Sequence, residues 1–346
     1  MGEPLIECVP NFSEGRNKDI IDAIINSITQ VDGVSLLDVD MGADFNRTVV
    51  TMVGKPEAVL KAAIKSTGVA LDLIDMTKHS GEHARMGAVD VVPFIPLSNS
   101  SMDDCVSLSE RYAKSVSDKF GIPIYLYAES ARKESRVKLP DIRKGEYEGL
   151  KQKLSKPEWK PDFGPSDFIP RSGVTATGAR QVLIAFNVNL NTNDKSLANI
   201  IAGKIRTSGV IMRDENGNKI VDSRGNILRK SGKFKALQAA GWMYDDDTAQ
   251  VSMNLLDHTT TGLHDVFDAI RLEANKLELE VTSSELVGLV PMQAMIQAGN
   301  HYSPNSEESN ENKILQHAVD GLYLDGLQDF DVSASVIELA VRRNEH

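Results

Sequence analysis

The densest group of reactive side chains in the sequence runs from His79 to Gly87. Within seven residues it carries two imidazoles, one carboxylate and one guanidinium, on His79, Glu82, His83 and Arg85. Loops at the ends of strands often carry active-site residues, and a histidine there can take up or release a proton near neutral pH. We therefore predict a catalytic loop, against the alternative of surface side chains that share no role.

The same segment also contains His-x-x-Glu-His, the signature of one class of zinc protease. That motif needs a helix, which places both imidazoles on one face toward the metal. Gly81 lies between the two histidines and Gly87 directly precedes an apolar run, a pattern that favours a loop entering a strand. No third metal ligand is evident, so we expect no metal site here.

A second group of charged residues flanks a predicted turn. Asp38 and Asp40 end an apolar strand, and alternation along the strand puts both on the same side. A hairpin would bring Arg47, within Asn46-Arg47-Thr48, close to them. One interpretation is an ordinary Asp–Arg surface pair, which contributes little to stability. The other is a carboxylate that orients a histidine or a substrate amine.

A third group spans 162–180 and is rich in glycine and proline. A free linker would not expose Phe163, Phe168 and Ile169, so we predict a ligand loop at a domain junction, where pockets are common. Its glycines let backbone donors approach a flat ring, and Arg171 or Arg180 could pair with a carboxylate.

The elements that must position these groups follow a recognisable order in the first half. Hydrophobic periodicity predicts strand, helix, strand, strand, helix, strand, at 5–9, 17–30, 34–40, 47–53, from 56, and 88–95. That is the βαββαβ order of ferredoxin-like domains. A helix at 103–119 and a strand at 122–127 follow, and the polar stretch 137–167 is typical of a helix plus irregular connection.

The second half is predicted to repeat this order. Strands are expected at 181–188, 236–244, 249–255 and 286–290, with helices after 194 and around 263–270. An exposed hairpin insertion at 209–233 carries the turn signals Asn216-Gly217 and Arg224-Gly225. We therefore predict an α/β (α+β) protein of two ferredoxin-like βαββαβ subdomains, 1–179 and 180–346, with a ligand groove between them.

The charge and cysteine content narrow the function classes. The net charge of −11 argues against a general affinity for nucleic acid or for anionic membranes, which requires a basic face. Two cysteines, Cys8 and Cys105, suit a reduced compartment. We see no signal peptide pattern at the start and no apolar run of about 18 residues, so the expected location is cytoplasmic.

Segments along nearly the whole chain share the pattern of one known family. They are 7–15 (ECVPNFSEG), 36–40 (LLDVD), 46–48 (NRT), 81–87 (GEHARMG), 90–96 (DVVPFIP), 162–166 (DFGPS), 178–180 (GAR), 184–187 (IAFN), 254–257 (NLLD) and 286–291 (LVGLVP). In these segments the chain resembles the formiminotransferase family, which includes the N-terminal part of the bifunctional formiminotransferase–cyclodeaminase.

The resemblance implies a function and a set of site residues. It implies a glutamate formimidoyltransferase with tetrahydrofolate as co-substrate and no metal, usually a homodimer, with His83 as the catalytic residue and Asp40 assisting it. Arg47 and Arg85 are candidates for the carboxylates of formiminoglutamate. The loop implied to line the folate site comprises Gly164, Pro165, Ser166, Asp167, Phe168, Ile169, Pro170, Arg171, Ser172 and Gly173.

Two departures from the family pattern leave alternatives open. Ala84 stands where the family commonly has proline, and the 209–233 hairpin is longer than usual. The one-carbon donor could instead be formiminoglycine, or 5-formyltetrahydrofolate passing a formyl group to glutamate, and a folate-binding protein without catalysis is the non-enzyme alternative. A cyclodeaminase, if needed, is expected as a separate protein.

Overall fold

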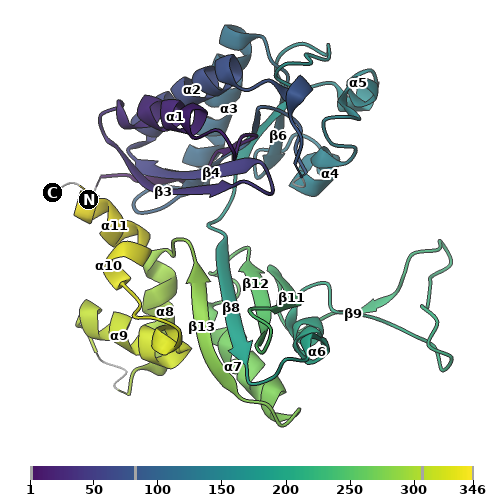
Figure 1. Cartoon of the computed structure of the whole chain (residues 1–346), viewed down its shortest axis with the longest axis vertical. Helices are drawn as coiled ribbons and strands as arrows, with labels where there is room; N and C mark the ends of the chain where they lie inside the picture. Colours follow the sequence, from purple (N-terminus) through teal and green to yellow (C-terminus); the bar gives the residue numbers. More distant parts are fainter. Residues whose placement is uncertain (1–2, 82–83, 305–307, 345–346) are drawn as a thin grey trace. The chain divides into compact units, whose positions relative to one another are not determined.

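The computed structural model describes residues 3–81, 84–304 and 308–344 (Figure 1). The chain divides into two compact units, Met1–Gln181 and Val182–Asn344. No helix in the described ranges is long and apolar enough to cross a membrane.

The first unit is built on one mixed sheet. Its elements are β1 (Ile6–Cys8), β2 (Asn11–Phe12), α1 (Lys18–Thr29), β3 (Val34–Gly42), β4 (Arg47–Gly54), α2 (Pro56–Leu73), β5 (Val89–Pro96), α3 (Met102–Phe120), β6 (Ile124–Ala128), α4 (Leu139–Arg143), α5 (Leu150–Leu154) and β7 (Thr175–Ala179). β1 and β2 are two pieces of one strand position, since both pair with β4 and with β5. The resulting order, β3-β4-(β1, β2)-β5, confirms the predicted βαββαβ arrangement.

Local sequence signals explain the long helices of this unit. The side chain of Asn17 caps α1, and its buried stripe is Ile21, Ile24 and Ile28. A capping box formed by Ser101 and Asp104 starts α3, which ends at Gly121 in the left-handed region. Apolar residues of α1, α2 and α3 share one core with the strands, so the helices cover a single face of the sheet.

The predicted junction loop at 162–180 needs a correction. Its last part forms β7, which lies between β5 and β6 and runs parallel to both, inside the first unit. The hydroxyls of Thr175 and Thr177 donate to the carbonyls of Val89 and Val92, at 2.7 Å each. A segment of threonine, alanine and glycine resembles a loop in sequence, but these small side chains fit a strand that is buried on both sides.

The second unit repeats the order on a four-stranded sheet. Its elements are β8 (Ile184–Leu190), α6 (Lys195–Ile205), β9 (Val210–Ile211), β10 (Arg229–Lys230), β11 (Leu237–Met243), β12 (Ala249–Leu255), α7 (Leu263–Asn275), β13 (Val281–Val287), α8 (Met292–Tyr302), α9 (Glu311–Leu322), α10 (Val332–Ser335) and α11 (Ile337–Asn344). The strand order β11-β12-β8-β13 confirms the predicted repeat. The last strand starts earlier than the predicted 286–290, because the polar residues Thr282 to Glu285 belong to it.

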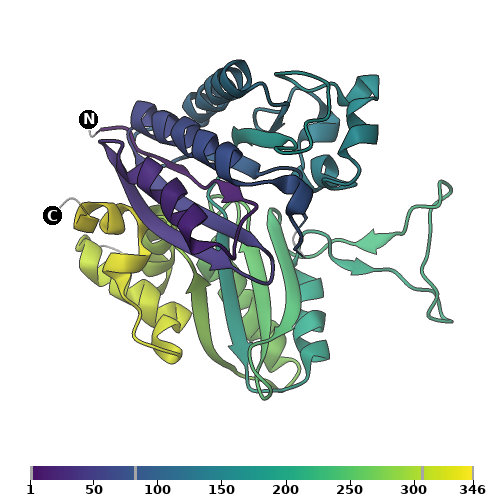
Figure 2. The same ribbon diagram turned by 45° about the horizontal axis from the view of Figure 1, so that its top comes forward.

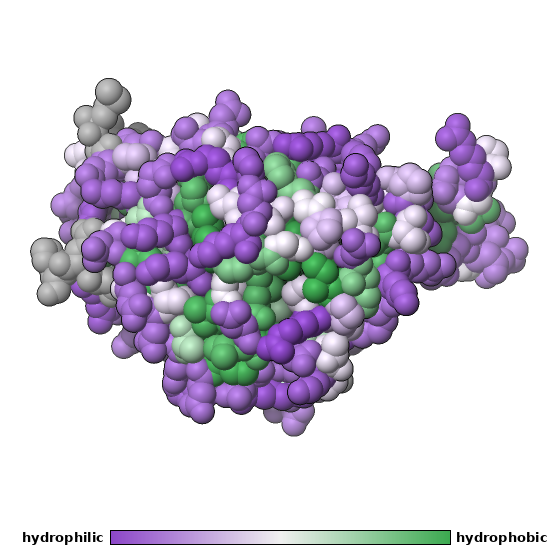
Figure 3. Space-filling model, turned by 90° about the horizontal axis from the view of Figure 1, so that it is seen from above, coloured by the Kyte–Doolittle hydropathy of each residue, from purple (hydrophilic) through white to green (hydrophobic). Residues whose placement is uncertain are grey.

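The insertion at 209–233 is a hairpin that projects from the second unit, as predicted (Figures 1 and 2). Two turns of identical construction shape it, Asp214–Asn218 and Asp222–Asn226. In each, the aspartate side chain accepts backbone N–H groups two and four residues ahead, and a glycine takes positive φ. Hydrophobic side chains are visible on the surface of this hairpin (Figure 3). Val221 is one of its exposed hydrophobic residues.

Candidate functional site

Two of the predicted groups meet in the first unit around the side chain of Asn46, together with the segment that precedes α1. Asn46 Oδ1 accepts the backbone N–H of Gly15 at 2.9 Å, and Asn46 Nδ2 donates to the carbonyl of Ser80 at 2.9 Å. Its own carbonyl lies 2.9 Å from His79 Nε2. One nearly buried amide therefore joins the loop before α1, the β3–β4 turn and the loop that starts at His79.

Glycines allow this close approach of three backbones. A Cβ atom on Gly15 would overlap backbone atoms of Gly42 and Arg47, and one on Gly81 would overlap the carbonyl of Phe45. Asn46 itself has a φ of 48°, a conformation that asparagine tolerates better than most residues. The β3–β4 turn is thus shaped to receive the His79 loop.

The contacts of His79 fix one state of its ring. Arg85 Nε donates to His79 Nδ1 at 3.3 Å, so Nδ1 must be unprotonated and Nε2–H donates to the carbonyl of Asn46. Burial lowers the pKa of His79, and the neighbouring Arg85 cation lowers it further, against the opposing effect of the bond to Asn46. His79 is therefore neutral at pH 7 with both nitrogens occupied, which suits a positioning role better than proton transfer.

Arg85 has carboxylate partners of its own. It donates from Nη1 and Nη2 to both oxygens of Glu148, at 3.0 and 2.6 Å, and from Nη1 to Glu146 at 3.2 Å. The bonds to Glu148 raise the pKa of Arg85, although partial burial opposes them. Its predicted role in holding a substrate carboxylate would require these glutamates to be displaced.

Of the two arginines predicted to bind a substrate carboxylate, Arg47 is more available for such binding than Arg85. Within the described residues its guanidinium forms no ion pair, and it lies 6.0 Å from the ring of Phe45. Burial is the main influence on the pKa of Arg47 and lowers it, while the negative charges of Asp40 and Asp90 favour the cation. A half-buried cation near two carboxylates, but bonded to neither, can accept an anionic ligand.

Asp90 forms a buried ion pair that no pattern in the sequence predicted. Its Oδ2 accepts two hydrogen bonds from Arg143, of which that from Nε is 3.0 Å, and its Oδ1 accepts the N–H of Met86 at 2.7 Å. Complete burial raises the pKa of Asp90, while Arg143 opposes that rise. This pair ties α4 to the start of β5 and holds the end of the reactive loop.

The segment 164–173 is a loop, and it is anchored at several points. Arg171 donates to the carbonyl of Asp72 at 2.6 Å, and the hydroxyl of Tyr147 donates to that of Pro170 at 2.6 Å. The carbonyl of Ser172 accepts from Ala88 N at 2.9 Å. The far end of this loop therefore lies beside residues 86–88, next to the reactive loop.

The described parts of the reactive loop contain no helix. Residues 79–81 and 84–87 are irregular apart from a bridge between Gly87 and Gly173, which favours the loop interpretation over the zinc-protease helix. Glu82 and His83 lie outside the described residues, so the catalytic assignment of His83 stays a prediction. Across the described ranges, no three histidine, cysteine, aspartate or glutamate side chains group in a way that could hold a metal ion.

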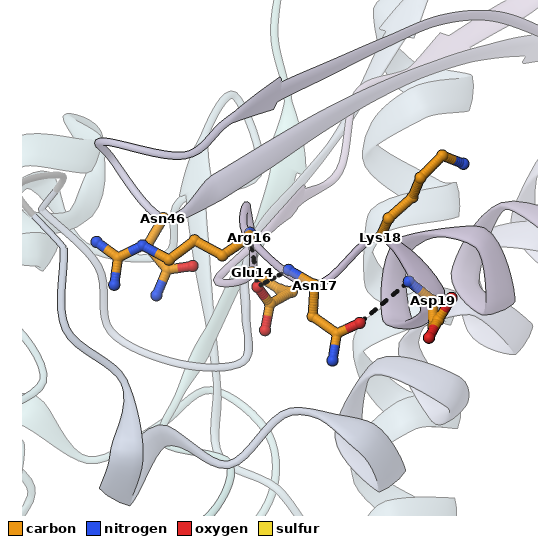
Figure 4. A pocket seen from close by; sticks show the side chains of 6 residues that line it. All are labelled: Glu14, Arg16, Asn17, Lys18, Asp19 and Asn46. Carbon is orange, nitrogen blue, oxygen red and sulfur yellow. Dashed lines mark hydrogen bonds between the residues drawn. The ribbon is translucent and has the colours of Figure 1, made fainter.

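An open pocket of about 450 Å³ adjoins this junction (Figure 4). It is lined by Glu14, Arg16, Asn17, Lys18, Asp19 and Asn46. Arg16 Nε donates to the carbonyl of Ala43, and Glu14 Oε1 accepts the N–H groups of Arg16 and Asn17 at 2.8 Å. The pocket mixes both signs of charge and reaches the same Asn46 side chain that organises the reactive loop.

Asp40 lies on β3, exposed and paired across the strands with Val49, with Arg47 two positions before Val49 on the neighbouring strand. The structure thus brings Asp40, Arg47, Asn46, His79 and the end of the 164–173 loop into one unit. Sequence reasoning missed the carboxylates that hold Arg85 and the Asp90–Arg143 pair. Their only signal was an excess of charged residues in 137–167, a stretch without periodicity.

Comparisons with known proteins identify the family to which both units belong. The family model described as "Formiminotransferase domain, N-terminal subdomain" matches residues 5–180, and that described as "Formiminotransferase domain" matches 185–342. Formimidoyltransferase-cyclodeaminase of Gallus gallus is 46% identical over 347 residues, covering 99% of this chain and 60% of that protein. Glutamate formimidoyltransferase of Streptococcus pyogenes serotype M1 is 38% identical over 314 residues, covering 90% of this chain and 98% of that protein. The chain thus spans about 60% of the length of its bifunctional relatives.

Proposed function

Because the chain belongs to the formiminotransferase domain family, we propose that it is a glutamate formimidoyltransferase, which moves the formimino group of N-formimino-L-glutamate to tetrahydrofolate. The observation that carries this proposal is the pair of family matches, which together span residues 5–180 and 185–342. The relatives include two proteins named glutamate formimidoyltransferase, each covered over more than nine-tenths of its length. The reaction would serve histidine degradation and one-carbon metabolism.

The transfer requires two proton movements and one tetrahedral intermediate. N5 of tetrahydrofolate attacks the formimino carbon and loses its proton, and the glutamate nitrogen gains a proton and leaves as a neutral amine. A single imidazole with a pKa near neutrality can take the first proton and supply the second. Most of the rate gain should come from holding two substrates in contact, because no covalent intermediate with the protein is needed.

We assign the proton transfers to His83 and the support of its cation to Asp40. Of the two histidines in the loop, His79 has both nitrogens occupied, which leaves His83 as the better acid–base candidate. The loop is anchored on each side of His83, through Ser80 to Asn46 and through Arg85 to Glu148. Such anchoring at both ends is what a catalytic side chain in a loop requires.

The substrate carboxylates and the folate have separate candidate partners. We assign a carboxylate of formiminoglutamate to Arg47, which forms no ion pair within the described residues, and keep Arg85 as a weaker candidate. The folate site is assigned to 164–173, where the backbone is fixed by contacts at Pro170, Arg171 and Ser172. A rigid loop can present backbone groups to a flat ring without an ordering cost at binding.

The assembly and location follow the same proposal. We propose a cytoplasmic homodimer, in line with the buried, unpaired thiols of Cys8 and Cys105 for the compartment. A cyclodeaminase would consume the product, as the relatives that carry both names in one chain suggest. Neither nucleic acid nor a membrane surface is expected as a partner of a chain with net charge −11.

A donor-selection assay tests the proposal. Purified protein is mixed with tetrahydrofolate and either formiminoglutamate or formiminoglycine, and 5-formiminotetrahydrofolate is measured after acid conversion to its methenyl chromophore. A third reaction supplies glutamate and 5-formyltetrahydrofolate. Preference for formiminoglutamate supports the proposal, preference for another donor replaces the substrate but keeps the family chemistry, and folate binding without any turnover would favour the non-enzyme alternative.

A further inference from the structure

One face of the second unit's sheet is polar, and neither α6 nor α7 packs on it. These two helices cover the opposite face, where Phe186 contacts Phe267 and Gly241 approaches the backbone of Asn199. Cross-strand pairing puts three rows of residues on the polar face. The first row is Trp242, Gln250, Asn189 and Ser283, the second is Ala240, Ser252, Asn187 and Glu285, and the third is Gln238, Asn254, Ala185 and Val287.

The polar side chains of these rows form one connected network that ends on Glu285. Asn187 Nδ2 donates to Glu285 Oε1 at 2.8 Å, and Gln250 Nε2 donates to Asn189 Oδ1 at 3.1 Å and to Glu285 Oε1 at 3.5 Å. Asn189 in turn donates to the hydroxyl of Ser283 at 3.2 Å. Because an ionised carboxylate can only accept, both amides must turn their NH₂ groups toward Glu285.

This orientation turns the carbonyl oxygens of both amides away from Glu285, and Asn187 Nδ2 keeps one N–H that no bond between described residues uses. No hydrogen bond between described residues reaches Glu285 Oε2, Asn187 Oδ1 or Gln250 Oε1. None of these three oxygens is both buried and without a partner. Asn187 and Gln250 are nevertheless largely buried residues held in place by the network. The polar face therefore presents mainly acceptors around one negative charge.

Such a face selects a ligand by its hydrogen-bond donors. It repels carboxylates and phosphates and complements a neutral or cationic group with two adjacent N–H donors, which a carboxylate can bind in a bidentate manner. The small side chains of Ala185, Ala240 and Ser252 leave a flat floor beside the acceptors, with Trp242 exposed at the edge. A planar N–C–N group is the chemistry that matches both the acceptors and the floor.

We propose that Glu285, held by Asn187 and Gln250, binds the paired N–H donors of a planar N–C–N group on a substrate. This inference rests on the proposed function, whose two substrates each carry such a group. In tetrahydrofolate it is the N3–H and 2-amino edge of the pterin ring, and in formiminoglutamate it is the amidinium. The shared chemistry defines the site, and steady-state kinetics separates the two sources.

The test compares Glu285→Gln with Glu280→Gln, which removes the same charge from an exposed residue just before β13. Because a hydrogen bond to a charged acceptor contributes strongly to binding, its loss in Glu285→Gln should raise the KM of one substrate by roughly 10- to 100-fold. A rise in the KM of tetrahydrofolate alone identifies the pterin, and a rise for formiminoglutamate alone identifies the amidinium. Unchanged values for both, or equal rises accompanied by a lowered melting temperature, overturn the inference.

A binding measurement keeps this result separate from the proposed function. Titration of tetrahydrofolate, followed by calorimetry, gives a Kd that does not depend on turnover, and an analogue lacking the 2-amino group serves as the probe of the paired donors. For a pterin site, the wild-type protein favours tetrahydrofolate over the analogue and Glu285→Gln loses that preference. A wild-type protein that binds but never turns over contradicts the proposed function and leaves this comparison valid.

Discussion

Replacing Asn46 by alanine should weaken both the fold of the first unit and the reaction. The change removes the acceptor of the Gly15 N–H, in a buried bond, and the donor to the Ser80 carbonyl, in a partly buried bond. Leaving a buried backbone group unpaired costs about 1–3 kcal/mol, so two such losses predict about 2–4 kcal/mol after partial relaxation. Alanine at positive φ adds about 1 kcal/mol of backbone strain.

Asn99 provides the matched control for that strain. It also has positive φ, at 54°, but it is exposed and its side chain makes one long bond of 3.4 Å to the carbonyl of Glu3. Asn99→Ala should therefore cost only about 1 kcal/mol, mostly backbone strain. The difference between the two variants isolates the two side-chain hydrogen bonds of Asn46.

Urea denaturation gives both free energies of unfolding, and the formimino-transfer assay gives kcat. We expect Asn46→Ala to lose about 2–4 kcal/mol more than Asn99→Ala and its kcat to fall at least about tenfold, because the anchor of the reactive loop is lost. If the two variants unfold within about 0.5 kcal/mol of each other, or if Asn46→Ala keeps its kcat, Asn46 does not hold the loop as described.

Three further changes test other parts of the structure. Gly173→Ala should destabilise the protein by several kcal/mol more than Gly217→Ala, since both glycines have positive φ but only a Cβ on Gly173 would overlap the carbonyl of Met86; equal unfolding free energies would contradict the packing. Arg136→Met should lower the free energy of unfolding by about 3–5 kcal/mol, because it leaves Asp162 unpaired in the interior. Arg132→Met, at an exposed ion pair with Glu110, should lower it by under about 1 kcal/mol. Urea denaturation that ranks the two variants in the opposite order would contradict this prediction. The pKa of His79 is lowered in the folded state, so its contribution to stability is present above pH 6.5 and is lost as the pH falls. The variant His79→Gln should therefore show a smaller decline in unfolding free energy between pH 7 and 5 than the wild-type protein. An unchanged slope would exclude that contribution.

Periodicity alone predicted the framework of both units. The isoleucine stripe of α1 and the alternating strands β3 and β4 follow directly from burial of one face, so their pairing order could be inferred. β7 could not, because Thr175 to Ala179 is buried on both faces by small residues and shows no alternation. The early start of β13 was missed for a different reason. Its first residues are polar, as is typical of a loop, and Glu285 among them accepts a hydrogen bond from Asn187.

The sequence predicted which side chains are reactive, but it did not predict the residues that hold them in place. Asn46 was noted beside Arg47, but its role depends on backbone groups 31 and 34 residues away. Glu148 lies 63 residues from Arg85, in a stretch whose charged residues gave no pattern. Local sequence reveals which side chains can do chemistry, while the partners that fix their protonation and orientation come from distant segments brought together by the sheet.

The most direct test of the central claim compares turnover of His83→Ala and His79→Ala with the wild-type protein. Each is assayed with saturating tetrahydrofolate and formiminoglutamate, with folate binding measured alongside. We predict that His83→Ala binds folate but loses activity by roughly 10²- to 10⁴-fold, as expected for a missing acid–base group, while His79→Ala is impaired much less. Near-normal turnover by His83→Ala would contradict the assignment and the mechanism built on it.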